Sequence, residues 1–358
     1  KDLNWFFNQW YFNAGHPKID VSYDYNTIQK KVTVNLQQLN ATEFEFPLAI
    51  DIYENEKKTR HNVFVDGVDA SFTFSYQEQP TLIEINADGV LLCEISENKV
   101  LSDYIFQLKN ADNYAHRRMA LLEVAKKQEE KLAFNAVVNA MSDASYEIRI
   151  LALEKIDLIN KFSKKNAIQK IMKIANTDEK TLVQAAAIET LGKLTDLELK
   201  GIFAKGLESK SYSVIGKSLV AMYYVDKQQA IKKSRALPDA IRKILATPLT
   251  RIYIEEKDEK ELPFISKSVL SGMFLTGDDA TKAIYQKAFT QISESNNSEA
   301  IQNLVNDMVV KGTQYKSFNF DKVVINLMRR MVQDQKTKNT LNRTKNTAII
   351  KEAMAKLL

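Results

Sequence analysis

The 358-residue sequence predicts a multidomain β + α protein, in which a small antiparallel β-sandwich is followed by an all-α superhelical domain. Apolar residues alternate with polar ones up to about residue 95, and from residue 101 they follow a helical period instead. The helical part also carries a weak internal repeat. A hydrophobic content of 45% is enough for packed cores, and two or three domains are expected at this length.

The strand prediction depends on alternation with a period of two residues. Apolar residues alternate with polar residues over 31–36, and the ranges 48–52 and 72–76 show the same pattern. Turn-like residues separate these runs at near-regular spacing, which is typical of a small sandwich of about seven strands. Asp66-Gly67 and Asp88-Gly89 are the expected hairpin turns.

The helical part contains four segments that align with one another at offsets of about 31 to 35 residues. Each has a small residue followed by an apolar one, namely Ala120-Leu121, Ala152-Leu153, Ala187-Ile188 and Ser218-Leu219. A small residue at a fixed site lets two helices approach closely, and the apolar neighbour fills the contact between them. Stacked helix pairs of this kind predict a solenoid of the HEAT or armadillo type.

The first seventeen residues are unusually rich in large rings. Six of them lie within eight positions: Trp5, Phe6, Phe7, Trp10, Tyr11 and Phe12. We expect a helix with Asp2 as its N-cap, ended by Gly15 and Pro17. Such a helix is not expected to stand alone in water, so it either joins the core of the sandwich or forms an inter-domain contact. The density of rings favours the contact, whose expected residues are Trp5, Phe6, Trp10, Tyr11 and His16. His16 has a second interpretation, as a turn residue where the chain leaves this segment.

The run Asp-Leu-Asn-Trp-Phe-Phe-Asn-Gln-Trp, a short spacer, Gly-His-Pro and a strand together resemble the end of the catalytic domain of zinc aminopeptidases of the aminopeptidase N (gluzincin) family. The resemblance implies that residues 1–17 are the terminal helix of an absent catalytic domain. Residues 18–100 would then form the β-sandwich domain and 101–358 the helical HEAT-like domain. On this interpretation the chain is expected to be the C-terminal half of a larger enzyme.

The chemistry that the resemblance implies is missing from this sequence. The family's H-E-x-x-H zinc motif with a distal Glu does not occur, and neither does its Gly-x-Met-x-Asn loop. No two of His16, His61 and His116 are four residues apart, and Cys93 alone cannot form a thiolate cluster. We therefore expect no catalytic, cofactor-binding or metal-binding residue here and no activity of this chain alone, with zinc bound by the absent domain.

The resemblance also implies a role. The parent enzyme would hydrolyse N-terminal residues from peptides, and this chain would be a non-catalytic region that encloses and gates the peptide chamber. Its partners would be its own N-terminal catalytic domain and peptides. Arg117 and Arg118, at the start of the first repeat helix, are possible contacts for a peptide carboxylate. A solvated helix face or a salt bridge between repeats would also explain this pair.

Other functions are also considered. A non-enzymatic HEAT-like scaffold for protein interactions is the alternative, and a free-standing carbohydrate- or peptide-binding sandwich would leave the aromatic helix unexplained. The net charge of +5 comes from 50 basic and 45 acidic residues mixed along the chain, which argues against nucleic-acid binding. No apolar run approaches the roughly 18 residues of a membrane span. The compartment is not determined by this sequence.

Overall fold

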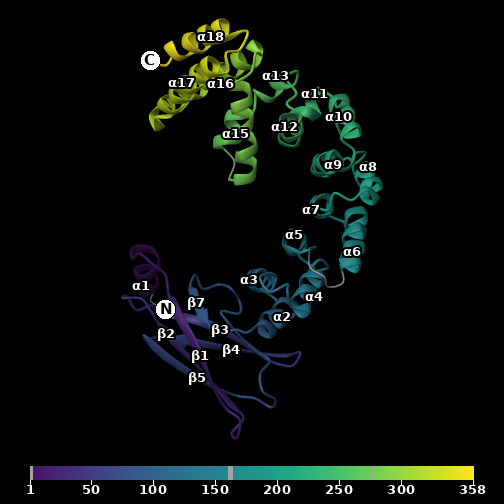
Figure 1. The fold of residues 1–358 in the computed structure, drawn as a ribbon. Coiled ribbons are helices and arrows are strands. Elements are labelled where there is room, and N and C mark those ends of the chain that lie inside the picture. Colours follow the sequence, from purple (N-terminus) through teal and green to yellow (C-terminus); the bar gives the residue numbers. More distant parts are fainter. Residues whose placement is uncertain (1–2, 160–163, 276) are drawn as a thin grey trace. The chain divides into compact units, whose positions relative to one another are not determined.

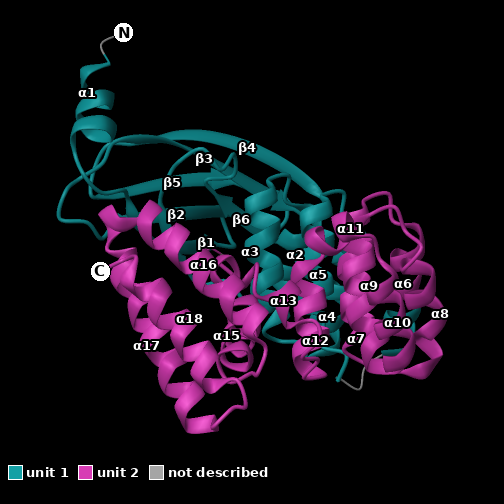
Figure 2. Ribbon diagram, turned by 90° about the horizontal axis from the view of Figure 1, so that it is seen from above, with its two compact units in different colours: residues 1–170 teal, residues 171–358 magenta. Residues whose placement is uncertain are grey.

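The computed structural model describes residues 3–159, 164–275 and 277–358. The chain divides into two compact units, Lys1–Lys170 and Ile171–Leu358, coloured separately in Figure 2. The boundary falls within helix α6 (Lys164–Thr177). Figure 1 traces strands in the first part of the chain and helices in the rest. The predicted order of a β part followed by an α part is therefore correct.

The aromatic segment is helical, as predicted, but it is not a regular α-helix. One turn, α1 (Asn4–Phe7), continues as the π-helical η1 (Asn8–Phe12). The expected N-cap, Asp2, lies outside the described residues. Gly15 adopts a φ of +101°, which L side chains rarely tolerate, and the extended chain then enters the first strand.

The described residues hold seven strands in two sheets. They are β1 (Lys18–Asn26), β2 (Lys31–Gln38), β3 (Phe46–Glu54), β4 (Lys57–Val65), β5 (Asp69–Ser75), β6 (Leu82–Ile85) and β7 (Glu94–Glu97). The four-stranded sheet has the order β5-β2-β1-β7 and the three-stranded sheet β4-β3-β6. Four of the five pairings are antiparallel, but β7 runs parallel to β1. The predicted antiparallel sandwich is thus only partly correct, because β7 arrives from the other sheet rather than through a hairpin.

Both expected hairpin turns are wrong. Asp66-Gly67 joins β4 to β5 and Asp88-Gly89 joins β6 to β7, and in each case the two strands lie in different sheets. The hairpins are instead β1–β2 and β3–β4. Lys30 and Asn55 provide the left-handed turn residues there, with φ near 50°.

One apolar core lies between the sheets. Val32 and Val34 of the first sheet and Ile50 of the second are fully buried in it. Strands β3 and β6 are buried on both faces, since nearly every residue in them is inaccessible. Helix α2 (Leu101–Asn110) contacts β6. These two strands are therefore the internal part of the second sheet, whereas β4 at its edge is largely exposed, and this explains how the sheet can hold buried charges.

The remaining helices of the first unit are α3 (Tyr114–Ala125), α4 (Lys131–Ala140) and α5 (Tyr146–Lys155). The second unit holds α7 (Thr181–Gly192), η2 (Leu197–Leu199), α8 (Lys200–Gly206), α9 (Tyr212–Val225), α10 (Lys227–Ala236), α11 (Asp239–Ile244), α12 (Ala246–Glu255), α13 (Leu262–Ile265), α14 (Val269–Phe274), α15 (Asp279–Ser293), α16 (Ser298–Gln314), η3 (Lys316–Phe318), α17 (Phe320–Lys338) and α18 (Arg343–Ala355). Within the described ranges, no helix is both long and apolar enough for a bilayer.

The four aligned small residues, Ala120, Ala152, Ala187 and Ser218, lie in α3, α5, α7 and α9 and are all fully buried. Their apolar neighbours are equally inaccessible. This is the burial expected where helices pack closely. The change from strand to helix falls between Glu97 and Leu101, while the expected domain limits at residues 17 and 100 stay a prediction.

Candidate functional site: an exposed aromatic surface

The aromatic segment is attached to the first unit through a few specific contacts. The Gln9 side chain donates to the carbonyl oxygen of Glu45 and accepts from its N–H, each at 2.8 Å. The Trp10 ring lies on Phe44, a core residue, with centroids 5.7 Å apart. Trp5 makes an edge-to-face contact with Phe64 on β4 at 6.1 Å. These contacts set the orientation of the segment.

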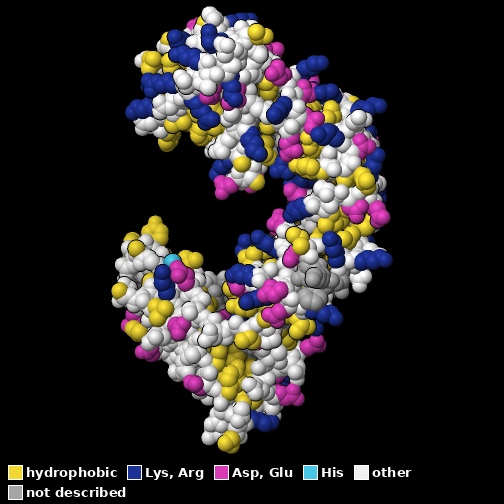
Figure 3. Space-filling view, viewed as in Figure 1, with side chains coloured by type: hydrophobic (Ala, Val, Ile, Leu, Met, Phe, Trp, Pro, Cys, Tyr) yellow, Lys and Arg dark blue, Asp and Glu magenta, His cyan; other side chains and the backbone are white. Residues whose placement is uncertain are grey.

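The remaining ring faces of the segment point to solvent. We define the aromatic surface as Trp5, Phe6, Phe7, Tyr11 and Phe12, whose exposed fractions run from 37% for Trp5 to 77% for Tyr11. Figure 3 shows hydrophobic side chains gathered at this end of the unit. Trp10 is half-buried against the sandwich core and does not belong to the surface. Ring contacts join Trp5, Phe6 and Phe7 in one group and Tyr11 and Phe12 in another. Groups of large exposed rings of this kind usually mark an interface.

His16 lies where the chain passes from the segment into β1. Its Nε2 is 2.7 Å from a carboxylate oxygen of Glu94, and its carbonyl oxygen accepts from Asn40 at 2.9 Å. The bond from His16 lowers the pKa of the Glu94 carboxyl. The side chain therefore links the chain just before β1 to β7, and its contact with another domain stays a prediction.

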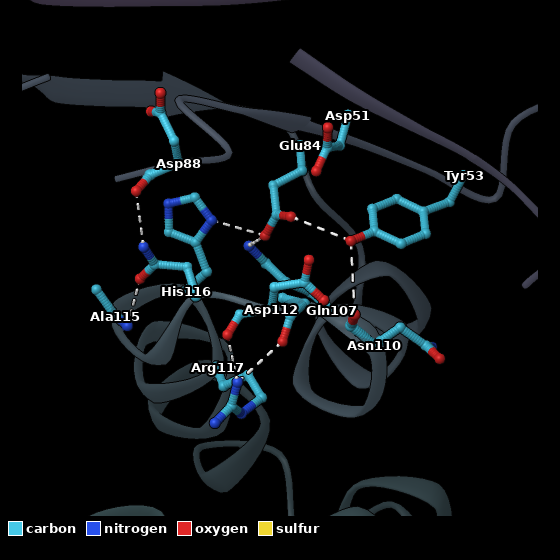
Figure 4. A network of polar contacts seen from close by, with 12 residues as sticks. Asp51, Tyr53, Glu84, Asp88, Gln107, Asn110, Asp112, Ala115, His116 and Arg117 are labelled. Carbon is cyan, nitrogen blue, oxygen red and sulfur yellow. Dashed lines mark hydrogen bonds and ion pairs between the residues drawn. The ribbon is translucent and has the colours of Figure 1, made fainter. Parts of the chain in front are cut away.

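A buried polar network, formed by Glu84, His116, Gln107 and Tyr53, lies on the helix-facing side of the second sheet (Figure 4). Glu84 is only 1% exposed. One of its oxygens is 2.7 Å from His116 Nδ1 and accepts from Gln107 at 3.2 Å. The Tyr53 hydroxyl lies 3.4 Å from the other oxygen. Burial, and then the charge of Glu84, raises the pKa of Tyr53, so its hydroxyl remains a donor. Each of these four residues has at least one partner inside the chain, although the buried Gln107 Oε1 accepts no hydrogen bond from the described residues. These internal contacts give the network a structural role.

Asp51 is a second buried carboxylate and faces Glu84 across the β3–β6 pair. The Arg60 guanidinium forms a two-bond contact with Asp51, and Lys58 lies 3.9 Å from it. Lys58 also pairs with Asp112. Cations on β4 thereby compensate Asp51, while Glu84 has His116 of α3 as a close polar partner.

The two arginines at the start of the first repeat helix, α3, have different surroundings. The Arg117 guanidinium contacts both oxygens of Asp143 at 3.0 and 3.2 Å, and it donates to the carbonyl oxygens of Ala111 and Asp112. This is the ion pair between successive helix pairs that the sequence left open as an alternative. Arg118 is exposed. Contact of either residue with peptide stays a prediction, and Arg118 has the more accessible side chain.

The described residues contain no group of three or more His, Cys, Asp or Glu side chains placed to hold a metal ion. Burial raises the pKa of the Cys93 thiol to about 11, so the thiolate that a nucleophilic role requires is disfavoured near neutral pH. The arrangement of the aromatic surface is suited to binding a partner rather than to bond cleavage.

Sequence reasoning missed the buried network. Asp51 occupies a polar position in the alternating range 48–52, a pattern that predicts one face towards solvent, and Glu84 lies outside the alternating ranges named above. The available signal was weak: both strands are otherwise apolar, as strands buried on both faces are. The sequence around Gln107 does not indicate that this residue is buried, because its burial depends on how α2 packs against the second sheet.

No protein-family model matches the chain, and no curated protein resembles it significantly in sequence. Among solved structures it is similar to aminopeptidase A of Legionella pneumophila in complex with aspartic acid, with 14% identity, a TM-score of 0.39, and coverage of 99% of this chain and 50% of that one. It is also similar to the CpcE–CpcF complex of phycocyanin lyase from Nostoc sp. PCC7120, with 14% identity, a TM-score of 0.38 and coverage of 74% and 96%. It is similar as well to the Escherichia coli protein YibA, with 18% identity, a TM-score of 0.41, and coverage of 71% of this chain and 91% of that one. The chain thus spans half the length of the aminopeptidase it matches, and likeness at this level does not define a function.

Proposed function

We propose that this chain is the non-catalytic C-terminal region of a zinc aminopeptidase, and that its aromatic surface docks against the catalytic domain. The observation that carries the proposal is the exposure of five rings in a segment whose sequence resembles the end of such a domain. A catalytic domain packed against this segment, either in the same polypeptide or as a separate chain, would bury these rings and remove their contact with water. Each ring buries on the order of 150–250 Å² when it is covered.

In this proposal the helical part encloses and gates the chamber that holds the peptide, with stacked helices of the HEAT or armadillo type. The burial of the aligned small residues in α3, α5, α7 and α9 supports close helix stacking. Peptide hydrolysis by the parent enzyme would use zinc, a bound water and a general-base Glu, all of them in the catalytic domain. This chain alone would neither cleave aminoacyl substrates nor bind zinc stoichiometrically.

The experiment co-expresses this chain with the gluzincin catalytic domain expected to be encoded upstream of it. We expect a complex, and we expect the triple substitution of Trp5, Phe6 and Tyr11 by serine to weaken it by at least roughly a hundredfold, because central aromatic residues dominate interface energies. The matched control is Ile28→Ser, which removes a 95% exposed apolar side chain from the β1–β2 turn and should leave affinity unchanged. Equal binding by the triple variant would contradict the docking role.

The alternative function is a non-enzymatic HEAT-like scaffold for protein interactions, which the same stacked helices favour. The two proposals differ in the upstream coding sequence. An H-E-x-x-H motif followed by a distal Glu supports the enzyme, and an upstream domain without that motif supports the scaffold.

A further inference from the structure

The second unit contains a pocket that the proposed function does not use. Its cavity volume is about 560 Å³, within the range of sites for small organic ligands. The walls come from α7, α9, α12, the end of α11 and the start of α15, so all of them belong to this unit. We call it the α9 pocket, because α9 supplies more of its lining than any other helix.

The wall of the α9 pocket is largely apolar. Val220, Ile244, Pro248 and Ile284 line it, and Tyr224 exposes its ring there. Because the lining is helical, its backbone N–H and C=O groups are mostly bonded within the helices and are not free to pair with a peptide backbone. The occupant is therefore better matched by an aliphatic chain than by an extended peptide.

Some charged side chains at the pocket already have a partner in the chain, and others remain free to bind a ligand. Lys217 pairs with Glu189 at 2.6 Å. Asp278 is the N-cap of α15 and accepts from the backbone N–H groups of Ala280 and Thr281. The bond from the Thr281 hydroxyl, and then these backbone bonds, hold the pKa of its carboxyl below the usual range. Lys193 and Arg251 make no ion pair or hydrogen bond with any residue that the structure describes. Lys193 and Arg251 can therefore bind a ligand. The carboxylates of Glu189 and Asp278 already have partners within the chain.

From this combination we propose that the α9 pocket binds a medium-chain aliphatic carboxylate. The chain lies against the apolar wall, and the carboxylate meets Arg251, with Lys193 as the second cation. A guanidinium suits this purpose because its planar donors match the two carboxylate oxygens. This inference does not depend on the aromatic surface or on peptidase activity.

The test measures binding of decanoate to the whole chain by titration calorimetry, with decan-1-ol and decylamine as isosteres. We expect decanoate to bind at least roughly tenfold more tightly than either, since a charged hydrogen bond contributes about that much. Equal affinity for the alcohol, or no binding of decanoate at millimolar concentration, would overturn the proposal. Tighter binding of the acetylated peptide acid Ac-Leu-Leu-Phe than of decanoate would also overturn it, in favour of a peptide site.

Variants locate the site. Arg251→Gln should lower decanoate affinity roughly tenfold, whereas Lys232→Gln, an exposed lysine on α10, should not change it. Ala280→Trp places a large ring at the pocket from an exposed position and should abolish binding, while Ala348→Trp on α18 is the matched control. Circular dichroism and thermal unfolding check that each variant folds. Unchanged affinity in a folded Ala280→Trp variant would place the ligand elsewhere and refute the assignment.

Discussion

Two regions of the first unit reverse the usual relation between residue type and burial. The aromatic surface exposes rings such as Tyr11 at 77% and Phe12 at 72%, whereas Glu84 and Asp51 are charged residues with only 1% exposure. The reversal has a different meaning in each place. The buried carboxylates have their full set of partners within the chain, while the exposed rings have partners on one side only.

The comparison distinguishes an unusual burial that serves the fold from an unusual exposure that indicates an interaction. A buried charge is costly unless it is paired, and the contacts of Glu84 with His116, Gln107 and Tyr53 meet that requirement internally. An exposed ring costs free energy that only another molecule or domain can recover. Of the two regions, only the aromatic surface still needs a partner from outside the first unit, and we therefore place the interaction there.

The largest expected effect comes from removing the centre of the buried network. Glu84→Ala removes the acceptor of His116 and Gln107 and leaves the Tyr53 hydroxyl only the Asn110 carbonyl oxygen at 3.5 Å. It should lower the free energy of unfolding by about 3–5 kcal/mol. Urea denaturation followed by circular dichroism measures the change. Glu129→Ala, an exposed glutamate in the same unit, is the control and should change stability by less than about 0.5 kcal/mol. A loss as small as the control would show that the network contributes little to folding.

A smaller effect distinguishes the two kinds of ring within the aromatic segment. Trp10→Ala removes packing against Phe44 and should cost about 1–3 kcal/mol of unfolding free energy, because the ring is half-buried. Tyr11→Ala removes a ring that is 77% exposed and should change stability by less than about 0.5 kcal/mol. Thermal and urea unfolding of the two variants, compared with the parent chain, test the contrast. Equal losses would mean that the segment packs as one unit and that Tyr11 is not reserved for a partner.

The features that sequence predicted correctly are those that local spacing determines. The change from period two to a helical period placed the strands and helices, and the small residues Ala152 and Ser218 were expected at close helix contacts, where both are fully buried. The aromatic segment was found because six rings in eight residues exceed what a free helix can carry.

The features that sequence did not predict depend on pairing between distant residues. The parallel β1–β7 pair and the cross-sheet connection through Asp66-Gly67 follow from the order of strands, which turn residues do not encode. The α9 pocket was also missed, because its wall combines Glu189 with residues as distant as Ile284. Neither feature has a local signature in the chain.

Cys93 lies between the two extremes as a half-buried ionisable group, and near neutral pH its expected effect is on thiol reactivity and not on folding. Burial raises its pKa from 9.0 to about 11, against a weaker opposite effect of the Asn86 amide. At pH 8 the folded protein should therefore react with a thiol reagent about a hundredfold more slowly than the urea-unfolded chain, because the thiolate is the reacting form. Since the pKa is higher in the folded state, the contribution to stability is constant below pH 9.0 and is lost between 9.0 and about 11, where the unfolded thiol ionises first. Comparison with Cys93→Ala isolates this change from the tyrosines that titrate in the same range. Equal reaction rates in the folded and unfolded states would show that the thiol is open to solvent, and the packing of Cys93 on the sandwich core would then be wrong.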